Sequence, residues 1–136
     1  MRKVILAMFG LSLFILSSCR HDDPEPTTQQ KLLGAWKLQK AVDEYYKPMT
    51  VLMETDETLG EPGDSVVFKN DNTVHTYSPI DGEDQTTYQV LNDTTIRIED
   101  ELYKIRKLTP SELNLYQELA YPATNEKYVQ RIYFVR

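Results

Sequence analysis

Short segments in which apolar and polar residues alternate are the feature that most constrains the fold of this chain. Over residues 94–99 the alternation is strict, with Ile96 and Ile98 on one face and polar side chains on the other. Tyr103 and Ile105 repeat the pattern a few residues later. Successive side chains of a β-strand point to opposite faces, so a period of two indicates strands that are buried on one side. These segments therefore predict a β-sheet with one apolar face.

Clusters of turn-forming residues divide the chain into eight or nine such segments. Asparagine, aspartate and glycine gather at residues 70–72, 81–84 and 92–93, where we expect turns. The expected strands cover residues 35–45, 50–54, 66–68, 73–77, 87–90, 94–99, 103–105 and 128–135. Many short strands at regular spacing predict an all-β protein, built as an antiparallel sandwich or barrel.

The segment from Thr109 to Leu119 is compatible with two structures. Thr109, Pro110 and Glu112 match a helix capping pattern with proline at the first helical position, and apolar residues follow at near-helical spacing. The same residues also match a turn followed by a strand that points Leu113 inward. The pattern by itself leaves helix and strand open.

The first 18 residues have the pattern of a bacterial lipoprotein signal peptide. Arg2 and Lys3 precede an apolar run over residues 4–16, and the Leu-Ser-Ser-Cys sequence that ends at Cys19 resembles a lipobox. At about 1.5 Å per helical residue the run spans roughly 20 Å, which is too short for a hydrocarbon core of about 30 Å. We therefore expect cleavage of residues 1–18 and lipidation of Cys19.

The residues that follow the signal are expected to tether the protein to a membrane. Cys19 is the only cysteine of the chain, which excludes an internal disulfide, and two or more acyl chains on it would give stable anchoring. Residues 20–31 contain two prolines and no large apolar side chain, so a flexible tether is expected over residues 19–31. Asp22 and Asp23 resemble the acidic export signals of some surface lipoproteins. Both the periplasmic face of the outer membrane and the cell surface therefore stay open as locations.

Size and charge limit what the remaining chain does. Removal of 18 of the 136 residues leaves 118, enough for one tethered domain over residues 32–136. The whole chain has 15 basic and 21 acidic side chains, a net charge of −6. Because neutralising phosphates needs a basic surface, this balance argues against a nucleic-acid partner. It also argues against adsorption to anionic lipid, so the acyl chains on Cys19 are expected to make the membrane contact.

A glycine and a tryptophan at the start of the first expected strand carry a family resemblance. The residues that match in order are Gly34, Trp36, Val67, Phe68, Thr73, Tyr88, Tyr103, Lys104 and Ile105. This order resembles the lipocalins and, more closely, the small lipocalin-like lipoproteins of Gram-negative bacteria. The resemblance implies an antiparallel up-and-down barrel of eight or nine short strands over residues 32–136. It also favours a strand for the segment from Thr109 to Leu119.

The resemblance implies roles for individual residues. Trp36 would plug the closed end of the barrel and Gly34 would allow close backbone approach, so both are packing residues. Arg131 is the candidate for the arginine that lipocalins place against this tryptophan. Residues 46–64 would form a lid over the open end or a variable loop, and their polar composition favours the loop.

The interior of an eight-stranded barrel is either filled by side chains or wide enough for one small ligand. Both remain open, although the residues expected to point inward are mostly large. These residues are Phe68, Tyr88, Ile96, Ile98, Tyr103, Ile105, Leu113 and Leu115.

The chain offers few residues for metal or catalytic chemistry. Its two histidines are His21 in the tether and His75 in an expected strand, so neither a multi-histidine metal site nor a Ser-His-Asp triad is expected. We expect His75 to be a partly exposed strand residue. Asp81, Glu83 and Asp84 gather in one turn, but their spacing differs from that of a calcium-binding loop, so a solvated acidic turn is expected. We therefore expect no metal, no cofactor and no enzymatic activity.

The sequence thus predicts a lipid-anchored protein of the outer membrane whose lipocalin-like barrel binds a small apolar or amphipathic ligand. The alternative is a non-enzymatic interaction module whose side-chain-filled barrel presents its loops to another envelope protein. The nine tyrosines of the chain suit such a surface, although tyrosine is also common in sheet packing.

Overall fold

Nine β-strands and one short helix make up the structure, a computed structural model that describes residues 23–136. The elements are α1 (Thr28–Leu32), β1 (Gly34–Tyr46), β2 (Leu52–Leu59), β3 (Ser65–Phe68), β4 (Thr73–Ser78), β5 (Gly82–Asn92), β6 (Thr95–Ile98), β7 (Glu101–Leu108), β8 (Glu112–Tyr121) and β9 (Glu126–Val135). The predicted signal peptide and Cys19 lie outside the described residues. No helix within residues 23–136 is long and apolar enough to cross a membrane.

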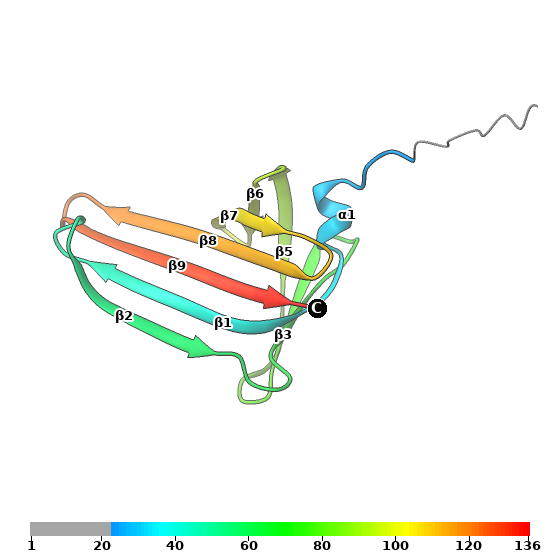
Figure 1. The fold of residues 1–136 in the computed structure, drawn as a ribbon, viewed down its shortest axis with the longest axis horizontal. Helices are drawn as coiled ribbons and strands as arrows, with labels where there is room; N and C mark the ends of the chain where they lie inside the picture. Colours follow the sequence, from blue (N-terminus) through cyan, green and yellow to red (C-terminus); the bar gives the residue numbers. More distant parts are fainter. Residues whose placement is uncertain (1–22) are drawn as a thin grey trace, which may run out of the picture.

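The strands form one antiparallel sheet that closes into a barrel (Figure 1). From β3 to β9 each strand pairs with the next along the chain, and β1 joins the two ends by pairing with β3 on one side and β9 on the other. This ring contains eight strands, and β2 is an additional strand beside β1. The predicted all-β, antiparallel barrel is therefore confirmed. The segment from Thr109 to Leu119 forms a turn followed by β8, so the strand interpretation is also confirmed.

The long strand β1 belongs to two parts of the sheet. Its residues 34–37 pair with β3, whereas residues 40–46 pair with β2 on the same edge. Gly60 lies where the partner changes, and its N–H donates to the carbonyl of Gln39 at 3.0 Å. A Cβ atom on Gly60 would lie 1.9 Å from the carbonyl oxygen of Leu38. The close approach of the two backbones at this point therefore requires glycine.

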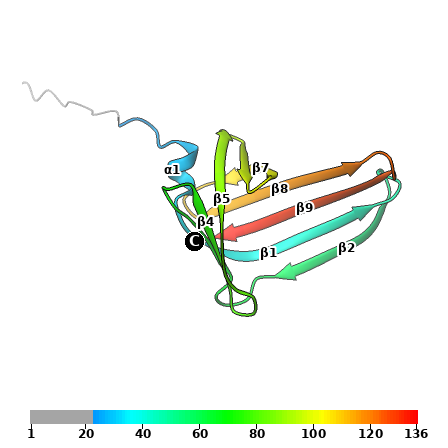
Figure 2. The ribbon, with the colours of Figure 1, turned by 180° about the vertical axis from the view of Figure 1, so that it is seen from behind.

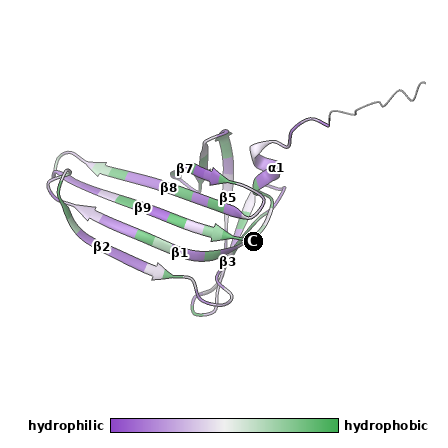
Figure 3. Ribbon diagram, in the orientation of Figure 1, coloured by the Kyte–Doolittle hydropathy of each residue, from purple (hydrophilic) through white to green (hydrophobic). Residues whose placement is uncertain are grey.

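Four strands extend beyond the barrel as an open sheet, which we call the platform. It consists of β2 and of residues 42–46 of β1, 126–131 of β9 and 116–121 of β8, in the order β2-β1-β9-β8. Figures 1 and 2 show these strands running side by side away from the helix. Hydrophilic residues occur along all four of them (Figure 3). The platform arises because these strands are longer than the barrel requires.

The barrel interior is filled by apolar side chains. Six of the eight residues predicted to point inward are buried in the core, and Ile98 and Tyr103 pack against it. The core cluster consists of Leu32, Trp36, Phe68, Val74, Tyr88, Ile96, Ile105, Leu113, Leu115 and Phe134. Phe68 and Tyr88 meet edge to face with their ring centroids 5.0 Å apart. Large side chains from strands that are not neighbours in the sheet therefore meet inside the barrel.

The short helix α1 closes the barrel end at which β1 begins. Its first turn is fixed by a capping box between Thr27 and Gln30. Leu32 and Trp36 are fully buried at this end, and the Trp36 indole N–H donates to the Leu32 carbonyl at 2.8 Å. Trp36 is thus a packing residue, as predicted. Residues 28–31, which the sequence placed in the flexible tether, instead form most of this helix.

Candidate functional site

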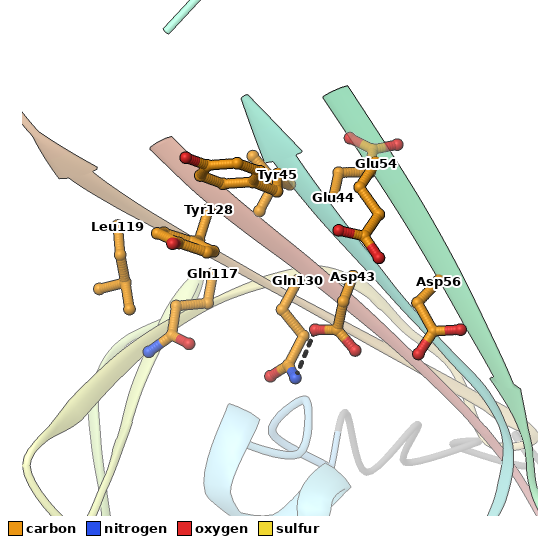
Figure 4. A pocket seen from close by; sticks show the side chains of 10 residues that line it. Asp43, Glu44, Tyr45, Glu54, Asp56, Gln117, Leu119, Tyr128 and Gln130 are labelled. Carbon is orange, nitrogen blue, oxygen red and sulfur yellow. Dashed lines mark hydrogen bonds between the residues drawn. The ribbon is translucent and has the colours of Figure 1, made fainter. Parts of the chain in front are cut away.

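The inner face of the platform carries a hollow of about 350 Å³ (Figure 4). Side chains alternate along each strand, so this face continues that of Leu115, which is buried inside the barrel. The hollow therefore lies at the open mouth, away from helix α1. Its lining residues are Asp43, Glu44, Tyr45, Glu54, Asp56, Gln117, Leu119, Tyr128, Val129 and Gln130.

One row across the platform is mainly apolar. The strand register places Tyr45 beside Tyr128, and Tyr128 beside Leu119. The rings of Tyr45 and Tyr128 are 4.9 Å apart between centroids and tilted by 31°. Tyr121 adds an edge-to-face contact with Tyr128 at 5.9 Å. Together these side chains form an aromatic surface that is open to solvent, since Tyr128 is 45% exposed.

The hydroxyl of Tyr45 is held at the tip of the platform. It donates to Glu126 Oε1 at 3.0 Å, and Lys47 Nζ lies 2.7 Å from the same oxygen. The hydrogen bond from Lys47 lowers the pKa of Glu126, with Thr124 and Tyr45 as further donors. Burial and the hydrogen bond to Glu126 raise the pKa of Tyr45. The tyrosine is therefore a neutral side chain in a fixed orientation.

The neighbouring row is polar. Its register runs from Asp56 through Asp43 and Gln130 to Gln117. The Gln130 amide donates to Asp43 Oδ1 at 2.9 Å, as the dashed line in Figure 4 marks. Gln117 is only 7% exposed and donates to Glu101 Oε2 at 3.2 Å. The row thus presents carboxylates on one side and amides on the other.

A second carboxylate contact connects this row to β7. Glu101 also accepts a hydrogen bond from the Tyr103 hydroxyl at 2.8 Å. Burial raises the pKa of Tyr103, and the hydrogen bond to Glu101 raises it further. Tyr103 therefore stays protonated and acts as a donor that orients Glu101. This network fixes the floor of the hollow next to the barrel core.

The hollow is acidic. Asp43, Glu54 and Asp56 line it, and none of its lining residues in the described part of the chain is a lysine or an arginine. Glu44 also lines the hollow, but its carboxylate is paired, with Arg131 Nη1 2.6 Å from Glu44 Oε1. Hydrogen bonds from Arg131 and Tyr46 lower the pKa of Glu44. Chemically, the site offers hydrogen-bond acceptors and negative charge next to an aromatic surface.

The structure corrects the predicted partner of Trp36. Arg131, the sequence candidate, pairs with Glu44 on the platform. The arginine at the tryptophan is Arg136, whose guanidinium carbon lies 3.8 Å from the centroid of the indole ring. Arg136 also donates to the carbonyls of Leu33, Leu32 and Lys31 at the end of helix α1. Arg131 lies within the last expected strand and Arg136 directly follows it, and only the strand register shows which of them reaches Trp36.

The segment 46–64 is neither a lid nor a loop. It contains β2, which pairs with β1 from Lys40 to Tyr46 and supplies Glu54 and Asp56 to the hollow. The sequence indicated only a weak strand near residues 50–54, because the β2 sequence LMETDETL is mostly polar and lacks apolar alternation. A strand that is exposed on both faces carries little hydrophobic signal.

His75 also differs from its expected environment. It is 9% exposed, which makes it a buried residue, and its Nδ1 lies 3.0 Å from Glu83 Oε1. Its ring stacks near Tyr77, with 6.4 Å between centroids. Of the acidic residues expected in one turn, Asp81 lies in an exposed turn, whereas Glu83 and Asp84 lie in β5 and pair with β4. Among residues 23–136, no group of three or more histidine, cysteine, aspartate or glutamate side chains is placed to hold a metal ion.

Sequence reasoning did not single out the residues that form the hollow. Tyr45, Tyr128 and Gln130 lie in expected strands, but strand patterns do not reveal which residues become neighbours. The only signal was the polar character of positions on the inward-facing side of β8 and β9. No known protein family matches this sequence, and none of the curated proteins matches it.

Proposed function

We propose that this protein is a lipid-anchored, lipocalin-like module of the bacterial outer membrane that binds a small amphipathic ligand in the hollow of the platform. The proposal includes no catalytic step and no cofactor. It places the ligand at the mouth of the barrel, because large apolar side chains fill the barrel centre.

One observation carries the proposal: an aromatic row and a row of carboxylates and amides lie side by side in one hollow. The volume of about 350 Å³ is within the usual range for small-molecule sites, roughly 300–1,000 Å³. An apolar part of a ligand would lie on Tyr45 and Tyr128, while its hydrogen-bond donors would meet Asp43 and Asp56. A purely apolar ligand would leave these carboxylates desolvated and unpaired, so an amphipathic ligand is favoured.

Native mass spectrometry of the domain purified from its own host tests this function. We expect a co-purifying small molecule that is lost in the double variant Tyr45→Ala/Tyr128→Ala. Tyr116→Ala is the matched control, because Tyr116 lies on β8 but faces away from the hollow. A domain without any bound molecule, or a molecule retained by the double variant, would contradict the proposal.

The membrane anchor is tested separately. Replacement of Cys19 by alanine is expected to move the protein from the membrane fraction to the soluble fraction, because the acyl chains provide the attachment. Cell fractionation followed by detection of the protein measures this. Unchanged membrane association of the variant would exclude lipidation of Cys19 as the anchor.

A second candidate function is an accessory module that contacts another envelope protein. The filled barrel interior favours it, because side chains such as Trp36 and Phe68 occupy the place of an internal ligand. In-cell crosslinking separates the two candidates. A protein adduct at the platform, together with an empty hollow by mass spectrometry, would support the accessory module.

A further inference from the structure

The outer edge of β2 is an unpaired strand edge. In the sheet order β2 is terminal, and among the described residues only β1 pairs with it. Figures 1 and 2 show β2 at the margin of the platform. A terminal strand leaves a row of backbone N–H and C=O groups without partners in the sheet. Such an edge is a template for one more strand.

The hydrogen bond of Gly60 identifies which backbone groups are free. Gly60 N–H points to β1, where it donates to Gln39 at 3.0 Å. In an antiparallel pair, the residues of a strand direct their backbone groups alternately to one side and the other. Residues 54, 56 and 58 therefore bond to β1. The N–H and C=O groups of Thr55, Glu57 and Leu59 point to the open edge.

The β2 edge lacks two of the devices that protect exposed edges. β2 contains neither proline nor lysine, and its eight residues are all exposed. Leu52, Met53 and Leu59 are 50, 60 and 66% exposed. Exposed apolar side chains along an open strand favour association with another chain.

The charge of β2 selects the kind of partner. Glu54, Asp56 and Glu57 give the strand three carboxylates, and of these Glu57 pairs with Lys40 at 2.8 Å. A second copy in antiparallel pairing near the strand centre would place Glu54 opposite Asp56 in both directions, or Asp56 opposite Asp56 in the neighbouring register. Like charges directly opposite each other are destabilising, which disfavours self-association through this edge. A basic strand would meet complementary charge instead.

We propose that the outer edge of β2 binds an extended, basic segment of a partner protein as an additional antiparallel strand. The segment would exchange backbone hydrogen bonds with Thr55, Glu57 and Leu59. Lysine or arginine at alternate positions would place the cations on the inner face, beside Glu54 and Asp56. This surface shares Glu54 and Asp56 with the hollow but uses no residue of the aromatic row, so variants of Tyr45 and Tyr128 separate the two proposals.

Binding of synthetic peptides of the same length as β2 tests this proposal. The probes alternate threonine with lysine, glutamate or serine, and fluorescence anisotropy measures their binding to the domain. We expect the lysine peptide to bind and the glutamate and serine peptides to fail. N-methylation of alternate backbone nitrogens of the lysine peptide should abolish binding, because it removes donors without removing charge.

Proline substitution on the protein provides the matched comparison. Thr55→Pro removes an outward N–H that has no partner in the sheet, so the domain should stay folded by circular dichroism. We expect it to weaken lysine-peptide binding about tenfold or more, as loss of backbone hydrogen bonds would do. Ala120→Pro on β8, the opposite margin of the platform, should leave binding unchanged, as should Tyr45→Ala/Tyr128→Ala.

Several results would overturn the proposal. If the N-methylated peptide bound as tightly as the unmodified lysine peptide, charge attraction alone would explain the binding and strand addition would be excluded. Equal binding by Thr55→Pro, or no binding of any peptide, would exclude strand addition at this edge. Dimerisation of the domain that Thr55→Pro abolishes, seen by light scattering, would assign the edge to a second copy instead.

Discussion

At the scale of single residues, Arg136 connects the end of the last strand to the helix that closes the barrel. Its guanidinium stacks on Trp36 and donates to three carbonyls at the end of α1. These carbonyls are the acceptors that a helix end leaves without internal partners. Arg136 and the indole N–H of Trp36 together satisfy the helix end, and with the capping box they stabilise a helix of only five residues.

Replacement of Arg136 by alanine should lower the free energy of unfolding by about 1–2 kcal/mol, from the lost cation–π contact and hydrogen bonds. Urea unfolding followed by circular dichroism measures this. Arg106→Ala is the control, because Arg106 lies 4.5 Å from the Tyr116 ring on the surface and should cost less. Equal losses in the two variants would contradict a special role of Arg136.

The Arg131–Glu44 pair predicts a pH dependence of stability. The folded-state pKa of Glu44 is lowered, so its contribution is present above the unfolded value of about 4.5 and is lost as the pH falls through the folded value. Glu44→Gln should therefore be less stable than the natural protein near neutral pH, by about 1 kcal/mol or less. This difference should shrink toward zero in acid.

Unfolding curves at a series of pH values measure the Glu44 effect. Glu57→Gln serves as control, because the Glu57 side chain is 48% exposed and its pair with Lys40 should contribute less. A difference between natural protein and Glu44→Gln that stays constant from neutral to acidic pH would contradict the assignment.

Residue roles could be predicted from the sequence only where packing alone decides them. Trp36 could be predicted as a packing residue, because a large indole two residues after a glycine at the start of a strand has few other uses. The arginine beside it was assigned to Arg131 instead of Arg136. These two residues differ in where the register of β9 places them, and a register is set by pairing with distant strands. His75 lies in a strand as expected, but its contacts with Glu83 and Tyr77, which the strand pattern does not reveal, accompany its burial.

At the scale of the elements, one edge of β1 pairs with two different strands, and Gly60 lies where the partner changes. Residues 34–37 close the barrel with β3, and residues 40–46 support β2. Gly60→Ala would bring a Cβ atom to 1.9 Å from the Leu38 carbonyl oxygen, so the backbones must separate. We expect a loss of about 1–3 kcal/mol in unfolding free energy.

Hydrogen exchange locates the Gly60 effect. Amides of β2 that bond to β1 should lose protection in Gly60→Ala more than those of β5 or β6. Thr58→Ala, which removes atoms from the exposed side of β2, is the control and should change little. A uniform loss of amide protection over the whole barrel would contradict the prediction that Gly60→Ala destabilises mainly the pairing of β2 with β1.

The elements that the sequence missed are those with weak hydrophobic patterns. The strands of the core alternate clearly, so most of them could be predicted, and with them the barrel. β2 and α1 lack this signal: β2 is exposed on both faces, and α1 buries Thr28 and Leu32 through tertiary contacts. Thr28 donates to Asp93 at 3.0 Å and Gln29 donates to Asn72 at 2.9 Å, contacts that no local pattern reveals.

At the scale of the whole molecule, the helix and the platform occupy opposite ends (Figure 1). The proposed anchor at Cys19 precedes α1 by a tether of eight residues, 20–27, with a reach of roughly 30 Å at about 3.5 Å per residue. The closed end of the barrel would then face the membrane and the hollow would face away from it. The candidate site could not be predicted from the sequence, because it forms where four strands extend beyond the barrel.

This orientation predicts different distances from the bilayer for two labelled positions. In liposomes that carry the lipidated protein, a dye on Ser111→Cys, in the turn beside α1, should transfer energy efficiently to a lipid acceptor. A dye on Ala123→Cys, in the turn between β8 and β9, should transfer less. Stronger transfer from position 123 would mean that the platform faces the membrane.

The platform contains none of the residues of the core cluster. Residues can therefore be added to or removed from the paired hairpins β1–β2 and β8–β9 in steps of two, which keep each side chain on its face, without altering the residues that stabilise the barrel. Hairpin length sets how far the recognition surface projects. Descendants of such a sequence are free to vary what they recognise while inheriting the same stable scaffold.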